Sequence, residues 1–298
     1  MATANNDGAN RKIVEWASEQ GIFARAENPA MRVISLGAGV QSTAMALMAA
    51  HGEIGPMPDC AIFADTGWEP QNVYDHLEWL MSPNVLPFPV HVVNNGNIRD
   101  MLTSRELDRF SAVPFFLKTG GDRGMGRRQC TNDFKLKPIM WKLRDLLGKG
   151  RRDRVAKQSV EVWIGISTDE AGRVAPAKQQ WIANHWPLIG ANMSRQDCLK
   201  WMESHSYPLP AKSSCIGCPF HNDLAWREMK ENDPASWADA VEVDSIIRRA
   251  GTAKSRAIKG EQYMHSSLKP LNEVDLSTAE DRGQLNFFIN ECEGMCGV

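Results

Sequence analysis

Short apolar runs alternate with helical apolar stripes over the first half of the chain, a pattern typical of a parallel α/β sheet. The runs predict buried strands at 32–36, 60–64, 89–93 and 160–166. Apolar residues at helical spacing predict a helix over 70–81, and Pro138 suits the first turn of another. We therefore expect an α/β fold, built as a doubly wound parallel sheet.

The pattern changes near residue 186, where the predicted helices follow one another without strands between them. These helices span 194–205, capped by Ser194, then 223–231 and 234–249. A segment rich in glycine and arginine, 118–128, predicts a loop. We divide the chain into an N-terminal extension at 1–30, an α/β region at 31–185 and a mostly helical region at 186–298 that contains the later cysteines.

The first strand passes through Gly37-Ala38-Gly39 directly into a helix. Such a corner presents unpaired backbone N–H groups, a positive helix end and the hydroxyls of Ser42 and Thr43, which together favour a phosphate. A dinucleotide fingerprint would need glycine or alanine in place of Ser42, and a Walker loop would need Gly-Lys-Ser/Thr, which is absent. The alternative is a glycine-containing turn of a parallel sheet that binds nothing.

Two further segments follow the ends of predicted strands. Asp65-Thr66-Gly67 ends the second strand, and 165–173, GISTDEAGR, follows the fourth. Open α/β sheets bind ligands at the carboxyl edge, so Asp65 is a stronger site candidate than most acidic residues.

Composition indicates a globular protein, with 43% hydrophobic residues in 298 and no apolar run near the roughly 20 residues of a membrane span. We expect no membrane association and a cytoplasmic location. The net charge of -2 hides an asymmetry, because 118–157 holds thirteen Lys/Arg and four Asp, a local net of +9. This segment favours an anionic partner, either nucleotide phosphates, a sulfate-like group or nucleic acid, unless it is a solvated face and linker.

The sequence has seven cysteines, and its first residues lack the apolar stretch of a secretory signal. This combination favours metal or redox chemistry over a disulfide scaffold. Cys215 and Cys218 form a CxxC before a proline, which suits zinc or one edge of an iron-sulfur cluster better than a thioredoxin-like pair. Further thiolates are available in three other cysteines: Cys130, Cys292 and Cys296. The spacing of the cysteines in the sequence does not decide between a zinc ion and an iron-sulfur cluster. Cys60 and Cys198 fit inert packing positions.

Several motifs together resemble the phosphoadenylylsulfate (PAPS) reductase family of the PP-loop, or adenine nucleotide alpha-hydrolase, superfamily. They are SLGAGVQST, FADTGWE, RQCTNDFKLKPI, GISTDEAGR and the segment from HWPLIG to SCIGCPF, which cover 32–220. The resemblance implies a PP-loop nucleotide-binding domain, although Ala38 and Gln41 depart from the SGGxDS pattern. It implies phosphate binding by Ser35, Gly37, Gly39, Gln41, Ser42 and Thr43.

The same resemblance implies further site residues. Asp65 would lie near the nucleotide or its Mg2+, and Gly165, Asp169 and Arg173 would line the far side. Four cations would neutralise negative charge around the cysteines that carry the sulfur chemistry: Arg127, Arg128, Lys135 and Lys137. Lys137 and Asp65 would also have catalytic roles. In the adenylylsulfate branch, a paired Cys-Cys joins a later CxxC to hold a 4Fe-4S cluster, and here Cys130 alone stands at the place of the pair. The resemblance therefore implies Cys130, Cys215 and Cys218 as ligands. The fourth must come from elsewhere, and we expect Cys292, with Cys296 either the alternative ligand or a spare catalytic thiol that relays sulfur.

Three functions remain open. The first is ATP-dependent sulfur transfer, yielding AMP and pyrophosphate, similar to PP-loop enzymes that put sulfur into nucleic acids, including the DNA phosphorothioation branch. The second is an oxidoreductase that forms sulfite from adenylylsulfate or PAPS. The third is a zinc-stapled nucleotide or nucleic-acid binder without turnover. The expected partners are an adenine nucleotide, a nucleic-acid or small anionic sulfur acceptor and a thiol or ferredoxin-type donor, with a homodimer left open.

Overall fold

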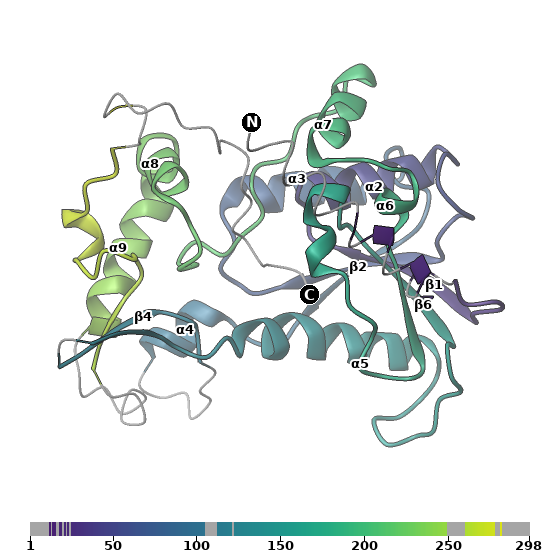
Figure 1. Ribbon diagram of the computed structural model, residues 1–298, viewed down its shortest axis with the longest axis horizontal. Helices are drawn as coiled ribbons and strands as arrows, with labels where there is room; N and C mark the ends of the chain where they lie inside the picture. Colours follow the sequence, from purple (N-terminus) through teal and green to yellow (C-terminus); the bar gives the residue numbers. More distant parts are fainter. Residues whose placement is uncertain are drawn as a thin grey trace. The chain divides into compact units, whose positions relative to one another are not determined.

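The computed structural model describes residues 25–104, 112–120, 122–248 and 260–277, together with residue 281 and a few single positions between 12 and 23 (Figure 1). Contacts divide the chain into two compact units that are each discontinuous in sequence. The sheet unit comprises Met1–Ala64, Gln71–Val93 and Pro138–Ser213. The cysteine unit comprises Asp65–Pro70, Asn94–Lys137 and Ser214–Val298. Cys292 and Cys296 lie outside the described residues.

The sheet unit is built around a five-stranded sheet of order β3-β2-β1-β6-β7. Its strands are β1 (Met31–Leu36), β2 (Cys60–Asp65), β3 (Val90–Asn94), β6 (Val160–Ile164) and β7 (Ile182–His185). β1 pairs in parallel with both β2 and β6, and β6 pairs in parallel with β7. The expected α/β fold with a parallel sheet is confirmed.

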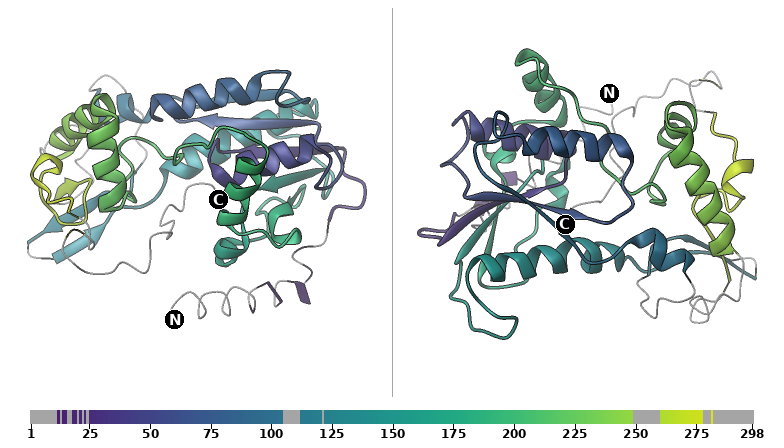
Figure 2. Two further views of the ribbon diagram at one scale, coloured as in Figure 1. Left: turned by 90° about the horizontal axis from the view of Figure 1, so that it is seen from above. Right: turned by 180° about the vertical axis from the view of Figure 1, so that it is seen from behind.

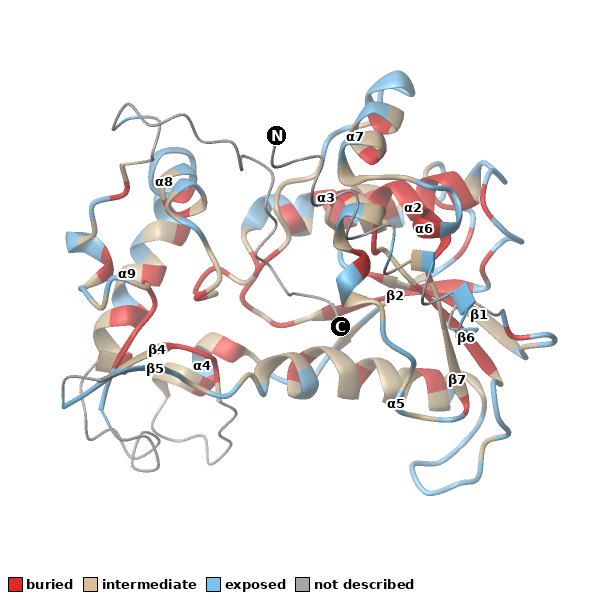
Figure 3. Cartoon of the chain, viewed as in Figure 1, coloured by how far each residue is buried: buried red, intermediate tan, exposed pale blue. Residues whose placement is uncertain are grey.

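Helices cover both faces of this sheet, as a doubly wound fold requires (Figure 1). On one face Phe63 belongs to the core that includes α2 (Val40–Ala50), α3 (Gln71–Met81) and α7 (Arg195–Ser204). On the other face Ile62 packs in the core that includes α5 (Lys137–Leu146). Successive side chains of a strand point to opposite faces, so β2 is buried along nearly its whole length (Figure 3).

Two short elements complete the sheet unit, the 3-10 helix η2 (Thr168–Arg173) after β6 and α6 (Pro187–Gly190) after β7. The predicted helix start at Ser194 is confirmed by a capping box. The Ser194 hydroxyl accepts a hydrogen bond from the Asp197 N–H at 3.2 Å, and the Asp197 carboxylate accepts one from the Ser194 N–H at 3.0 Å. Nowhere in the described chain is there a helix both long and apolar enough to span a membrane.

The cysteine unit has its own core, in which Trp68, Phe115, Trp226 and Met264 are buried. Its helices are α4 (Ile98–Thr103), the π-helix η1 (Thr131–Leu136), α8 (Asp223–Asn232), α9 (Pro234–Arg248) and the 3-10 helix η4 (Leu271–Glu273). Helices α8 and α9 lie side by side (Figure 2). Trp226 from α8 and Val243 from α9 join the same core, so both helices are stabilised by burying one face in it.

A three-stranded antiparallel sheet also belongs to the cysteine unit, in the order β5-β4-β8. It consists of β4 (Phe116–Thr119), β5 (Asp122–Met125) and β8 (Glu261–Tyr263). The prediction of a loop over 118–128 was therefore wrong at 118–119 and 122–125, which form strands. The positive φ of Gly120, +57°, permits the tight turn, and β8 supplies pairing from more than 130 residues away that the local pattern could not reveal.

Candidate functional site

The glycine corner of the sheet unit directs two backbone N–H groups at one oxygen atom. The N–H groups of Gly37 and Gly39 donate to the Ser42 hydroxyl oxygen at 3.1 and 3.3 Å. Between them Ala38 has a φ of 54°, a left-handed conformation that turns successive N–H groups toward one side of the chain. Two N–H groups that converge on one oxygen are the arrangement that anion sites use, and here the Ser42 hydroxyl occupies it.

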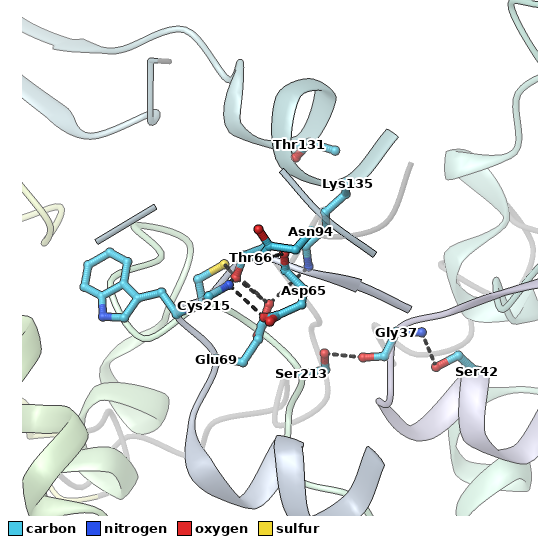
Figure 4. A network of polar contacts seen from close by, with 12 residues as sticks. Gly37, Ser42, Asp65, Thr66, Glu69, Asn94, Thr131, Lys135, Ser213 and Cys215 are labelled. Carbon is cyan, nitrogen blue, oxygen red and sulfur yellow. Dashed lines mark hydrogen bonds and ion pairs between the residues drawn. The ribbon is translucent and has the colours of Figure 1, made fainter. Parts of the chain in front are cut away.

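The walls of this corner are close-packed. A Cβ added to Gly165 would lie 2.9 Å from the Ser42 backbone N, so only glycine fits beside the loop. A Cβ on Gly39 would lie 3.3 Å from the Ser213 Cβ, and the Ser213 hydroxyl donates to the Gly37 carbonyl (Figure 4). Gly165 was among the predicted residues, whereas Ser213 was missed because it lies far along the chain.

Glu170 connects two residues that the sequence assigned to nucleotide binding. Its carboxylate accepts from the Gln41 amide at 3.0 Å and pairs with the Arg173 guanidinium at 2.5 Å. The neighbouring Asp169 accepts from the Arg195 N–H at 3.0 Å, which anchors the first turn of α7. The segment after β6 is therefore held against α2 and α7 through polar side chains, and Glu170 was not singled out beforehand.

Thr43 differs from the other residues predicted to bind phosphate. Its side chain is fully buried, and its hydroxyl lies 3.1 Å from His76 Nε2 in α3. Burial lowers the pKa of His76 from 6.5 to about 4, so this imidazole is neutral near pH 7. The Thr43 hydroxyl therefore links α2 to α3 in the interior, whereas Ser35 occupies the carboxyl end of β1 beside the corner.

In the cysteine unit, Cys130, Cys215 and Cys218 line one pocket. Cys130 belongs to a different segment from the CxxC pair, and tertiary structure brings the two segments together. Besides the thiols, most of the lining is apolar or cationic: Trp68, Ile98, Val113, Pro114, Pro219, Phe220, Arg128 and Lys135. Three of the four residues named as metal ligands are therefore placed at one site.

The turn that carries the CxxC fits closely against Trp68. The Cys218 N–H donates to the Cys215 carbonyl at 3.0 Å, which closes the turn, and the Ile216 N–H donates to the Trp68 carbonyl at 2.8 Å. A Cβ added to Gly217 would lie 2.1 Å from a ring atom of Trp68. The glycine between the two cysteines is therefore required by the packing of this indole as well as by the turn itself.

A polar network lies beside Cys215 (Figure 4). The Thr66 hydroxyl is 3.2 Å from the Cys215 Sγ and donates to the Glu69 carboxylate at 3.1 Å. The side chain of Glu69 is fully buried, and Lys135 Nζ lies 3.5 Å from it. Lys135 supplies the positive charge that a buried carboxylate requires. Thr66 and Glu69 were not assigned a role beforehand, although they flank the glycine of the FADTGWE motif.

Arg128 lines the pocket of Cys130, Cys215 and Cys218, called the thiol pocket below, and one of its hydrogen-bond donors is unused within the described residues. Its Nε donates to the Thr131 hydroxyl at 3.1 Å, and the guanidinium lies 5.4 Å from the centre of the Phe220 ring. Its Nη2 is buried and has no hydrogen-bond acceptor among the described residues. A buried N–H of a cation without an acceptor is costly, so this nitrogen suits an anionic group in the pocket.

The other predicted residues near the pocket have different surroundings. Cys130 directly precedes the π-helix η1, a rare element that often marks functional sites. Lys137 pairs with Asp133 at 2.5 Å, and Arg127 is exposed. Asp65 accepts a hydrogen bond from the Gly67 N–H at 2.7 Å, which shapes the turn after β2.

Cys60 and Cys198 lie in the sheet unit and are buried, as the sequence predicted for inert packing positions. Burial raises the pKa of the Cys60 thiol to about 11 and that of the Cys198 thiol to about 12. Both thiols therefore stay protonated near pH 7 and are poor nucleophiles and poor metal ligands.

No family model and no curated protein matches the chain. Solved structures are similar to it, among them the following two. One is the phosphoadenylyl-sulfate (PAPS) reductase from Candida auris in a phosphate complex, 12% identical over 67% of this chain and 81% of that chain, with a TM-score of 0.42. The other is the U34-tRNA thiolase NcsA from Methanococcus maripaludis with its 4Fe-4S cluster, 11% identical over 80% of each chain, with a TM-score of 0.38. Both are proteins of the kinds that the sequence motifs resemble, but at these identities the function has to be argued from this chain's own residues.

Proposed function

We propose that this protein is an ATP-dependent sulfur transferase that uses a 4Fe-4S cluster. The observation that carries the proposal is the pocket lined by three cysteines from two distant segments and by Arg128, whose Nη2 is buried. The glycine corner supplies a separate anion site in the sheet unit, where two N–H groups point at one oxygen. A thiolate set and a phosphate site in one chain are the two parts that such a reaction needs.

The surroundings of the thiols suit a cluster. Besides the thiols, the pocket is lined mainly by apolar side chains, with Arg128 and Lys135 as its cations. Such a lining limits the access of water to a cluster and offsets the negative charge of its thiolates. Zinc accepts the same four thiolates, so metal analysis decides between the two.

The described residues that would hold the cluster are Cys130, Cys215 and Cys218, and Cys292 or Cys296 would complete the set. When bound, the cluster supplies a place for inorganic sulfide. Arg128 and Lys135 would offset the negative charge that thiolates bring into an apolar pocket. Coordination by Cys215 requires a thiolate, so its hydrogen bond to Glu69, 3.5 Å in this structure, would be given up on binding.

In the sheet unit the N–H groups of Gly37 and Gly39 would bind phosphate oxygens of ATP, displacing the Ser42 hydroxyl. Asp65 is the candidate carboxylate for the Mg2+ that accompanies ATP. An acceptor oxygen then bonds to the α-phosphorus as the bond to the β-phosphate oxygen breaks, and pyrophosphate leaves. Sulfide next bonds to the activated carbon, and AMP leaves with the former acceptor oxygen. The exchange of oxygen for sulfide involves no net redox change, and Lys137 and Cys296 are candidates to assist it.

The test is to incubate anaerobically purified protein with ATP, sulfide and a mixed nucleic-acid pool. The expected products are AMP and pyrophosphate together with acid-stable sulfur in the acceptor. Cys218→Ser should lose sulfur incorporation, whereas the matched control Cys198→Ala should retain it. Sulfite formed from adenylylsulfate or PAPS with a thiol donor, without added ATP, would instead identify a reductase. Zinc bound by Cys215 and Cys218, without turnover on either substrate, would identify a nucleotide or nucleic-acid binder.

A further inference from the structure

A second cluster of metal-ligating side chains lies in the sheet unit. His51, Glu53 and His205 each offer one ligand atom, and these atoms all lie within 4.8 Å of one another. The three side chains are exposed, so a solvated ion can reach them. We propose that His51, Glu53 and His205 bind one divalent transition-metal ion, with Zn2+ the best match, separately from the thiol pocket.

The donor set identifies the class of metal. Two imidazole nitrogens and one carboxylate oxygen are the three-ligand set of open zinc sites, where water takes the fourth position. Imidazole also suits Ni2+, Cu2+ and Co2+, whereas Mg2+ and Ca2+ prefer oxygen ligands alone. The site should therefore accept first-row transition metals and reject alkaline-earth ions.

Each of the three ligands is oriented by a further hydrogen bond. The His205 Nδ1 lies 2.8 Å from the Trp201 carbonyl, which requires a proton on Nδ1 and leaves the Nε2 lone pair available, 3.9 Å from Glu53 Oε1. The Trp201 indole N–H donates to Glu53 Oε2 at 2.8 Å, so Oε1 is the oxygen left for the ion. His51 Nε2 lies 2.7 Å from the Tyr207 hydroxyl. Partners of this kind are the usual support of metal ligands.

The surroundings also favour a cation. His51 caps the C-terminal end of α2 and His205 caps that of α7, so the negative ends of two helix dipoles lie at the site. The His205 ring stacks on Trp201, with centroids 4.1 Å apart, which restricts its rotation before any ion binds. A bound ion would therefore join the ends of two helices that already pack together, and it would stabilise the sheet unit.

The test must keep zinc away from the thiol pocket. We would therefore use the full chain with Cys215→Ser and Cys218→Ser and titrate Zn2+ against a chromophoric chelator. One zinc per chain is expected, together with a rise in the melting temperature. Glu53→Gln and His205→Ala should each weaken zinc binding by about tenfold or more, because a lost ligand costs at least as much as a lost supporting contact. His91→Ala, a histidine of the same unit outside the cluster, is the matched control.

Cobalt gives an independent readout. Co2+ in the same double variant should show the visible bands of four-coordinate cobalt without thiolate charge transfer, and Glu53→Gln should abolish them. Glu53→Gln changes the side chain by one atom and should fold, as circular dichroism would check. Equal zinc affinity in the Glu53→Gln, His205→Ala and His91→Ala variants, or no zinc bound at all, would overturn the proposal. Neither result bears on the sulfur-transfer reaction, which is assigned to other residues.

Discussion

The glycine corner of the sheet unit and the thiol pocket of the cysteine unit are built in opposite ways. The hydrogen bonds that direct the N–H groups of the corner all lie within Gly37 to Ser42, although Gly165 and Ser213 pack against it. The pocket needs the turn at Thr66, the segment from Arg128 to Lys135 and the CxxC turn, all held by tertiary contacts. The corner should therefore respond to the few residues packed on it, whereas the pocket should fail when any of its segments moves.

The largest effect is expected from Gly217→Ala in the cysteine unit. The new Cβ would lie 2.1 Å from a Trp68 ring atom, so the indole or the CxxC turn must move. We expect a loss of about 3 kcal/mol in unfolding free energy, at the upper end for overpacking, together with reduced metal content. Denaturant unfolding with metal analysis measures both. Unchanged stability and metal content would show that the pocket does not depend on this fit.

Lowering the pH should decrease the stability of the sheet unit and increase that of the cysteine unit. Burial lowers the pKa of His76 from 6.5 to about 4, so the unfolded chain takes up the proton first and the sheet unit loses stability as the pH falls through this window. The shift corresponds to about 3 kcal/mol. Burial also lowers the pKa of His185 to about 4, with the same sign.

In the cysteine unit, burial raises the pKa of Asp244. The folded carboxyl is protonated at a higher pH than the unfolded one, so this unit gains stability as the pH falls toward the carboxyl range. Denaturant unfolding between pH 7 and pH 4, with probes in each unit, measures the difference. His76→Gln should remove a large part of the acid sensitivity of the sheet unit. An unchanged slope in that variant would contradict the role of His76.

A smaller effect is expected from Gly165→Ala. Its Cβ would lie 2.9 Å from the Ser42 backbone N and would shift the loop that presents the two N–H groups. We expect ATP affinity to fall about tenfold, equal to about 1.4 kcal/mol. Gly190→Ala is the matched control, because nothing lies within 4 Å of its added Cβ. Equal ATP affinity of the two variants, measured by calorimetry, would contradict a role of the glycine corner in binding ATP.

The smallest effect is expected from Ala38→Gly. Ala38 has a φ of 54°, which costs an L-residue about 1–2 kcal/mol and costs glycine almost nothing. The added freedom of the unfolded chain offsets part of this gain, so we expect a net stabilisation of up to about 1 kcal/mol. Thermal unfolding measures it. A destabilised variant would mean that the alanine methyl, which is buried, contributes more packing than the strain costs.

The sequence predicted local features better than assembled ones. The strand at β1, the glycine corner and the Ser194 cap depend on neighbouring residues, and each is present at its predicted place. The β4–β5 hairpin was missed because its partner strand β8 is distant in sequence. Cys130 was associated with the CxxC through the family resemblance alone, and Glu69 was missed because a lone acid in a motif does not reveal what it will contact.

The assignment of segments to the two units also depends on contacts between residues that are distant in sequence. Periodicity suggested consecutive regions, yet the contacts group Asp65–Pro70 and Asn94–Lys137 with Ser214–Val298. The chain therefore leaves the sheet unit at the end of β2, returns at α3 and leaves again after β3. Apolar spacing along a sequence reports which residues are buried, but it does not report which core they join.

The central claim is that the thiol pocket holds a 4Fe-4S cluster, and its most direct test is the metal content of the full chain purified without oxygen. We expect about four irons and four acid-labile sulfides per chain, with broad visible absorbance. Cys215→Ser should lose the iron and the sulfide, while Cys198→Ala keeps both. Zinc in place of iron that is lost in Cys215→Ser, or iron that survives in Cys215→Ser, would contradict the account.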